Sequence, residues 1–300
     1  MSGVGAPASN LKGIVLMCSA TALFLVNDTI VKSITQHLPP YEVLFLRGIA
    51  IMAIGFGLLL VTGQIRFVSK LLDPVVLSRN GFEVLATLGY IMGLAHAPIA
   101  DLNALSQLEP VLMTVVAVWF FGARVGRLEI ALIGFAFVGA LLVAQPGTGA
   151  FSAFALFGLW SACCAVARDL LSRKVHTEIP GLVVAVGAGM TVMLAGAVMM
   201  LLFEEFVMPD LRLILLMCLA AVFITGAHLC IFLAFRYGEV IAVTPFTYTS
   251  TIWALISGYV VFNTLPNTLG LIGIGLILVC GVGVVLIEGR RARLARLAIA

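Results

Sequence analysis

The class of fold is decided by residues 181–203, GLVVAVGAGMTVMLAGAVMMLLF, which contain no charged side chain. A helix needs roughly 20 apolar residues to cross the hydrocarbon core of a bilayer, so this segment is long enough to span a membrane. The rest of the chain has a similar composition, since 62% of its 300 residues are hydrophobic and only 10% are charged. A soluble protein of this composition would expose large apolar patches to water. The sequence therefore predicts an all-α, polytopic membrane protein.

Nine further segments are apolar over a comparable length. We predict ten transmembrane helices, at residues 13–32, 42–62, 75–95, 99–121, 128–145, 153–173, 181–203, 213–235, 240–262 and 268–287. Short connections rich in Pro, Gly and polar residues separate them, for example Leu38-Pro39-Pro40 and Gln145-Pro146-Gly147. The first apolar segment is too long for a cleavable signal peptide, so we expect it to remain in the membrane.

Lys and Arg residues are distributed unevenly between the two sides of the predicted bundle. With the N-terminus in the cytoplasm, two of the seventeen, Lys32 and Arg212, lie outside, and Arg47 and Arg168 lie within helices. The remaining thirteen lie in cytoplasmic segments: Lys12, Arg66, Lys70, Arg79, Arg124, Arg127, Arg173, Lys174, Arg236, Arg290, Arg291, Arg293 and Arg296. Cytoplasmic loops carry such an excess of positive charge. We therefore predict a multi-pass protein of the bacterial inner membrane with both termini cytoplasmic, and residues 288–300 as a basic, interfacial tail.

The two halves of the chain match weakly at a constant offset of 141 residues. Asp28 aligns with Asp169, and Gly134 aligns with Gly275. Each half contains five predicted helices, an odd number, so the second half enters the membrane with the opposite orientation. We predict two inverted five-helix repeats, residues 1–145 and 153–287, joined by a periplasmic linker at residues 146–152. Inverted repeats are typical of secondary carriers, whose substrate binds near the midplane between the repeats.

Three stretches of sequence have the order and spacing of a known transporter family. They are Gly122-Ala123-Arg124-Val125-Gly126-Arg127, residues 100–111, and residues 244–266. In these stretches the chain resembles EamA-type members of the drug/metabolite transporter superfamily, and in particular its amino-acid and aromatic-amino-acid exporters. The resemblance implies outward transport of a small metabolite, with an amino acid as the expected cargo. The family commonly has a glutamate at each of two junctions, where this chain has Ala123 and Thr264, so no role of those glutamates is carried over.

Charged and polar residues at mid-helix are the first candidates for a substrate site. A charge at the centre of a transmembrane helix costs about 2.5–3.5 kcal/mol on insertion scales, so it usually faces a cavity or a partner. Glu109 and Gln107 lie near the middle of the fourth helix beside Pro110, which leaves a backbone carbonyl unbonded. Glu109 is suited to a substrate ammonium or a proton, and His228 of the eighth helix to a carboxylate or to proton coupling. The alternative for both is a structural hydrogen bond between helices.

Three aromatic residues are predicted deep enough in the membrane to line a substrate cavity. They are Tyr90, Trp160 and Tyr248, whose amphipathic rings offer both an apolar surface and a polar atom. The alternative is a place in the aromatic belts at the membrane surfaces. Together with the candidates of the first, third, fourth, sixth, eighth and ninth helices, they predict a central cavity that alternating access exposes to either side.

Two pairs of polar residues occupy mirrored positions in the predicted repeats. Asn27 and Asp28 lie toward the outer end of the first helix, and their mates Arg168 and Asp169 lie toward the inner end of the sixth. These positions predict gates on opposite faces, although solvated helix ends are the alternative. Arg47 lies in the outer third of the second helix, and we expect it to extend toward the membrane surface.

Composition and motifs argue against several other functions. A net charge of +3 is too small to indicate nucleic-acid binding, and no P-loop indicates ATP-driven pumping. The six cysteines lie in apolar stretches without metal-ligand spacing, so we predict no cofactor and no metal. A facilitative channel and an intramembrane enzyme stay open as alternatives, although neither a continuous polar lining nor a nucleophile–base cluster is evident. The expected partners are a small-molecule substrate and the lipid bilayer, with proton coupling.

Overall fold

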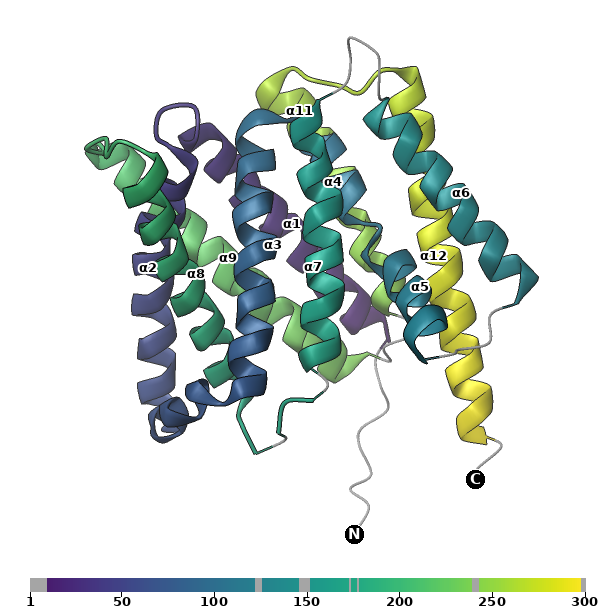
Figure 1. Ribbon diagram of the computed structural model, residues 1–300, viewed down its shortest axis with the longest axis horizontal. Helices are drawn as coiled ribbons and strands as arrows, with labels where there is room; N and C mark the ends of the chain where they lie inside the picture. Colours follow the sequence, from purple (N-terminus) through teal and green to yellow (C-terminus); the bar gives the residue numbers. More distant parts are fainter. Residues whose placement is uncertain are drawn as a thin grey trace.

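The computed structural model describes residues 10–121, 126–145, 152–172, 174–176, 178–238 and 243–297. Within these residues every regular element is helical, and each segment predicted from hydropathy contains helix (Figure 1). Six spans among the described residues are long and apolar enough to cross a membrane, and they belong to α1, α2, α7, α8, α9 and α12. The prediction of an all-α, polytopic membrane protein is thereby confirmed.

The first half of the chain contains one interruption that hydropathy did not indicate. Its helices are α1 (Asn10–Ile34), α2 (Pro40–Val61), η1 (Gln64–Leu72), α3 (Pro74–His96), α4 (Ile99–Ser106), α5 (Glu109–Phe121) and α6 (Arg127–Ala144). The predicted helix at residues 99–121 is divided into α4 and α5 by a turn at Gln107 and Leu108. Pro110 has no N–H to donate to the preceding turn, which explains why the helix is interrupted here.

The second half contains a similar interruption. Its helices are η2 (Ala153–Ala155), α7 (Leu156–Ser172), α8 (Gly181–Phe203), α9 (Leu211–Tyr237), η3 (Thr244–Tyr248), α11 (Thr249–Phe262) and α12 (Thr268–Leu297). The 3-10 segment η3 contains Pro245 and precedes α11, so the fourth predicted helix of this half also changes its winding. The basic tail continues α12 as helix as far as Leu297, rather than starting a separate helix.

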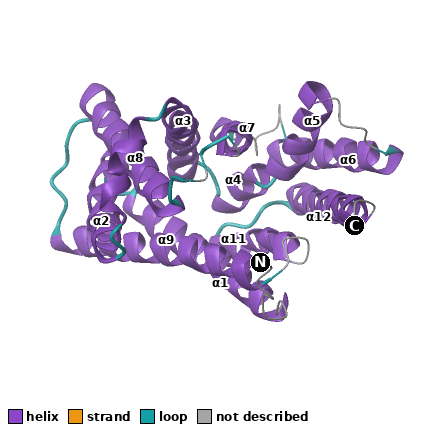
Figure 2. Ribbon diagram, turned by 90° about the horizontal axis from the view of Figure 1, so that it is seen from below, coloured by secondary structure: helices purple, strands orange, loops and turns teal. Residues whose placement is uncertain are grey.

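Helices of one half pack mainly on helices of the other half. α1 lies along α9, α3 along α7, α2 along α8, and α6 along α12 (Figures 1 and 2). The α6–α12 pair is especially close: a Cβ at Gly139 would lie 2.8 Å from the carbonyl oxygen of Gly273. Small residues allow such backbone contact between membrane helices. The core therefore lies between the halves and not within each of them.

Several predicted features lie outside the described residues. These are the junction at residues 122–125, residues 146–151 of the predicted linker, and the chain ends at residues 1–9 and 298–300.

Candidate functional site

The two interrupted helices are joined by hydrogen bonds. Gln107, in the turn between α4 and α5, donates from Nε2 to the carbonyl oxygen of Thr247 at 3.1 Å and to Oγ of Ser250 at 2.6 Å. The hydroxyls of Ser250 and Thr251 donate to Oδ1 of Asn103 in α4, each at 3.3 Å. Polar side chains inside a membrane protein are stable when they bond to one another across helices. Gln107 therefore belongs to a polar contact between the two halves.

A second set of polar residues, which we call the Asp28 cluster, comprises Asn27, Asp28, Arg47 and Tyr90. Asp28 accepts hydrogen bonds from the Tyr90 hydroxyl at 2.8 Å and from Nδ2 of Asn27 at 2.9 Å. Arg47 Nη1 donates to Oδ1 of Asn27 at 2.8 Å. The cluster joins α1, α2 and α3; Asn27 and Arg47 are buried, and Asp28 and Tyr90 are partly buried.

Arg47 lies in this cluster and not where the sequence led us to expect it. Its side chain is 7% exposed, so the expectation that it extends to the membrane surface is wrong. The hydrogen bond to Asn27 explains the difference, because it holds the guanidinium against the neighbouring helix α1. Hydropathy places a residue at a depth along its helix but does not give the direction in which its side chain points.

A third set, which we call the Arg168 cluster, comprises Arg79, Glu83, Glu109, Arg168 and Asp169. The Arg168 guanidinium lies 2.7 Å from Asp169, 3.5 Å from Glu83 and 3.7 Å from Glu109. Arg79 and Glu83, one turn apart on α3, form an ion pair at 2.9 Å. Charges within a membrane protein are stable when they are paired in this way. Arg168 of α7 therefore connects α3 and α5.

The two clusters lie at different depths along α3. Tyr90 follows Glu83 by seven residues, which corresponds to about 10 Å along a helix. Gln107 is close in sequence to both clusters. It follows Asn103, which is within hydrogen-bonding reach of Tyr90, by four residues, and it precedes Glu109 by two. We call the Asp28 cluster, the Gln107 contact and the Arg168 cluster together the polar path, which contains seven of the predicted site residues: Asn27, Asp28, Tyr90, Gln107, Glu109, Arg168 and Asp169.

Three predicted site residues lie outside this path. His228 is exposed on α9, where Nδ1 contacts the Ile224 carbonyl at 2.8 Å and the ring meets Phe24 edge-on. Tyr248 is buried in η3, and its ring packs directly on Gly281 of α12. Trp160 is 48% exposed on α7, and its indole N–H donates to the Leu85 carbonyl at 3.0 Å.

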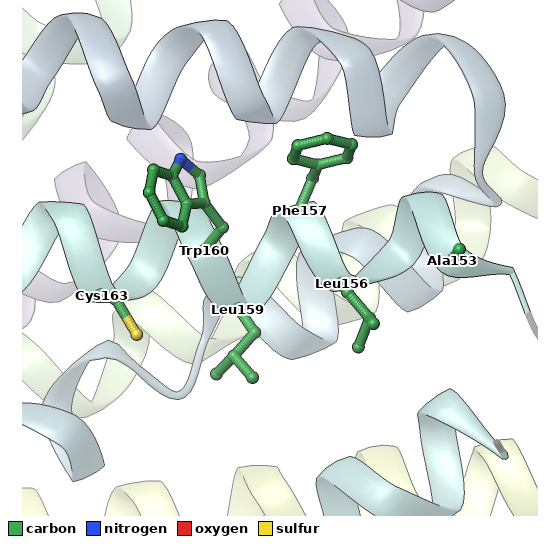
Figure 3. Close-up of a pocket in the computed structure, with 6 residues that line it drawn as sticks. All are labelled: Ala153, Leu156, Phe157, Leu159, Trp160 and Cys163. Carbon is green, nitrogen blue, oxygen red and sulfur yellow. The ribbon is translucent and has the colours of Figure 1, made fainter.

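Trp160 also borders an apolar hollow on α7. The hollow has a volume of about 400 Å³ and is lined by Ala153, Leu156, Phe157, Leu159, Trp160 and Cys163. Trp160 and Phe157 point toward α3, whereas Leu156, Leu159 and Cys163 point the other way (Figure 3). The lining contains no charged side chain, so this hollow is not suited to hold the ammonium or carboxylate of a charged metabolite.

Lys32 is a further residue of interest that the sequence analysis counted only as a loop charge. Its Nζ donates to the carbonyl oxygens of Leu94 at 2.7 Å and Ala97 at 2.6 Å, where α3 ends. It also lies 5.5 Å from the centre of the Phe262 ring at the end of α11. Cations are stabilised at the carbonyl end of a helix. The sequence does contain a signal, because Lys32 follows Asp28 by one helical turn and shares its face.

Two comparisons with known proteins find similarity to transporters. Residues 11–145 match the EamA-like transporter family. The chain is 29% identical over 174 residues to the pseudopaline exporter CntI of Pseudomonas aeruginosa, in strains UCBPP-PA14 and PAO1. That match covers 55% of this chain and 59% of the length of the exporters.

A solved crystal structure has the same fold. It covers 93% of this chain and 98% of its own, with a TM-score of 0.64 at 21% identity. Among the described residues, no group of three or more His, Cys, Asp or Glu side chains could hold a metal ion. In its first half, at residues 11–145, this chain is therefore similar to the EamA-like transporter family.

Proposed function

We propose that the protein is a secondary transporter that exports a small metabolite, most simply an amino acid, across the inner membrane by alternating access. Its similarity to this family and to the exporters supports transport as the general function. The observation that carries the proposal is the charged contact between the halves, in which Arg168 of α7 faces Glu83 of α3 and Glu109 of α5. Charged groups that lie between membrane helices usually mark the pathway of a substrate or ion.

The proposal includes ten membrane spans arranged as two inverted repeats. The helix pairs support it. If each helix is exchanged for the helix at the same position in the other half (α1 for α7, α2 for α8, α3 for α9 and α6 for α12), the α1–α9 pair becomes the α7–α3 pair. The same exchange returns the α2–α8 and α6–α12 pairs to themselves, and all four pairs are packed together. A twofold axis in the membrane plane, which relates inverted repeats, would produce this relation.

Two gates follow from the arrangement of charges. The Arg168 cluster forms the inner gate, and Lys32 with the Asp28 cluster forms the outer one. Asn27 and Arg47 of the outer gate are buried, whereas Asp28, Lys32, Tyr90 and the residues of the Arg168 cluster are partly buried. The Arg168–Glu109 contact of 3.7 Å is longer than a good hydrogen bond. A substrate ammonium could therefore replace Arg168 at Glu109, and binding would open the contact between the halves.

Transport by the purified protein in proteoliposomes tests this function. The panel consists of the twenty labelled L-amino acids, each measured with and without a pH gradient. We expect saturable flux and counterflow for at least one of them, because a carrier exchanges substrate across the membrane. Flux that does not saturate and shows no counterflow would instead indicate a channel, and the absence of any flux across the panel would contradict an amino-acid carrier.

The same assay tests His228 separately. If His228 binds substrate or couples protons, His228→Ala changes the pH dependence of the flux. Its exposed position on α9, outside the polar path, instead predicts unchanged transport.

A further inference from the structure

Arg47 has fewer partners than a buried guanidinium requires. It has five N–H donors, and one of them, at Nη1, donates to Asn27 at 2.8 Å. Its Nε is buried without a hydrogen-bond partner. Of the ion pairs among the described residues, none includes Arg47. The Arg47 side chain is only 7% exposed, and the neutral amide of Asn27 is the one group that accepts a hydrogen bond from it among the described residues.

Such an arrangement is costly unless an anion completes it. A buried charge is stabilised only when a counter-charge and further hydrogen bonds replace the lost water. Asp28 is the charged neighbour of Arg47, but its carboxylate accepts from Tyr90 and Asn27, and among the described residues no direct hydrogen bond or ion pair joins it to Arg47. The guanidinium therefore keeps donors in a planar fork, which is the geometry that binds a carboxylate through two parallel hydrogen bonds.

The position of Arg47 is also suited to a ligand. Asn27, Asp28 and Tyr90 link it by hydrogen bonds to the polar path between the halves. Glu109 lies in the Arg168 cluster of that path, 3.7 Å from the Arg168 guanidinium and within hydrogen-bonding reach of Asp169. The path thus contains an incompletely paired positive group in the Asp28 cluster and a carboxylate in the Arg168 cluster.

We propose that Arg47 binds the carboxylate group of the transported molecule, which takes the place of the Asn27 side-chain oxygen. This inference rests on the transporter function proposed above and narrows its substrate class to small carboxylates. Arg47 is then a binding residue, and Asn27 and Tyr90 position it and its neighbour Asp28.

Paired probes test the site directly. The twenty L-amino acids and their carboxamides differ only at the group that Arg47 would bind. We expect several acids, and not the matching amides, to raise the thermal unfolding temperature of the purified protein. Arg47→Gln should weaken the binding of those acids by about tenfold or more, because a hydrogen bond to a charged group is lost. Arg47→Lys keeps the charge without the planar fork, so its affinity should lie between the two.

A double variant separates binding from structural pairing. In Asp28→Asn with Arg47→Gln, neither charge remains to be balanced, so the protein should unfold near the wild-type temperature. If Arg47 binds the substrate carboxylate, this variant still fails to distinguish acids from amides. If it instead regains the wild-type preference for acids, Arg47 serves only to balance Asp28 and the proposal is wrong.

The remaining outcomes distinguish this proposal from the transporter function. Equal stabilisation by acids and amides, or none by any acid in the panel, contradicts a carboxylate site at Arg47. Saturable proteoliposome flux of an amine or a neutral compound would then leave the transporter function standing. Absence of flux for all of these compounds would contradict both proposals.

Discussion

At the scale of single residues, Glu109 is the clearest case of a polar side chain that both sequence and structure single out. The sequence places it beside a helix-breaking proline, and the structure places it 3.7 Å from Arg168 on another helix. Its carboxylate is partly exposed, in contrast to the buried Asn27 and Arg47. This combination of charge, loose pairing and access is what a substrate-binding group needs.

Replacing this charge should impair transport without unfolding the protein. Glu109→Gln keeps the shape of the side chain but cannot bind an ammonium as an anion. We expect flux in proteoliposomes to fall by about tenfold or more, equivalent to about 1.4 kcal/mol of lost binding free energy. Glu178→Gln removes a charge from an exposed position between α7 and α8 and serves as the control. Equal flux in the two variants would remove Glu109 from the site.

The close contact between Gly281 and Tyr248 predicts that a larger residue at position 281 destabilises the protein. A Cβ at this position would overlap the Tyr248 ring and hydroxyl, whereas a Cβ at Gly275 of the same helix meets no atom within 4 Å. We expect Gly281→Ala to lower the free energy of unfolding by about 1–3 kcal/mol, because overpacking forces side chains to shift. Gly275→Ala should be neutral or slightly stabilising. Thermal unfolding in detergent compares the two, and equal unfolding temperatures would contradict the close Tyr248–Gly281 contact.

The sequence predicted much of the polar path, and the misses have one physical cause. Asn27, Asp28, Tyr90, Gln107 and Glu109 were found because each polar side chain interrupts an apolar segment. The depth of a residue along its helix can be inferred from such interruptions. The direction in which its side chain points cannot be inferred when the helix is apolar on every side. Arg47 was therefore expected at the surface and is buried, whereas the role of His228, which is exposed on α9, stays a prediction.

At the scale of elements, α1 and α11 are joined by two hydroxyl pairs in the same register. Thr21 pairs with Thr249 at 2.8 Å and Thr29 pairs with Ser257 at 2.6 Å. The partners are eight residues apart on both helices, so α1 and α11 run in the same direction where they touch. These pairs join the first helix of one half to the interrupted helix of the other.

Removing one pair should loosen this contact measurably. Thr29→Val keeps the shape of the side chain and removes the hydroxyl that reaches Ser257. We expect a loss of about 0.6–1.7 kcal/mol, the range measured for hydrogen bonds between membrane helices. Thr225→Val removes a hydroxyl that bonds back to Ala221 within α9 and provides the control. If both variants unfold at the same temperature, the bond between α1 and α11 contributes nothing to stability.

The elements themselves could be predicted from hydropathy with good agreement, apart from the two interruptions. Hydropathy averaged over a stretch of sequence identifies a membrane segment because Leu, Val and Gly dominate that stretch. A single proline changes the average very little. A break beside Pro110 was expected and is found at Gln107 and Leu108, whereas the 3-10 segment η3 was missed although Pro245 was visible in the sequence. The short helix η1 was missed because it is amphipathic and lies between two apolar segments.

At the scale of the whole molecule, the distribution of Lys and Arg predicts which ends of the helices face the cytoplasm. Single cysteines in a cysteine-free background test this orientation with a membrane-impermeant thiol reagent. We expect labelling from the periplasm at Gln36→Cys and Glu205→Cys, and from the cytoplasm at Ser69→Cys, all of which are exposed positions. Ser152→Cys should also react from the periplasm. Reaction of Ser152→Cys from the cytoplasm would contradict the inverted repeats.

The packing of each half on the other has a consequence for how the chain is made. When α1 enters the membrane, the hydroxyls that will meet Thr21 and Thr29 lie 228 positions further along and have not been synthesised. The pairs α1–α9, α2–α8, α3–α7 and α6–α12 all await the second half in the same manner. The nascent first half must therefore persist among lipids as loosely associated helices. Its mature arrangement arises only after translation of α12, or by assembly of two separately produced fragments.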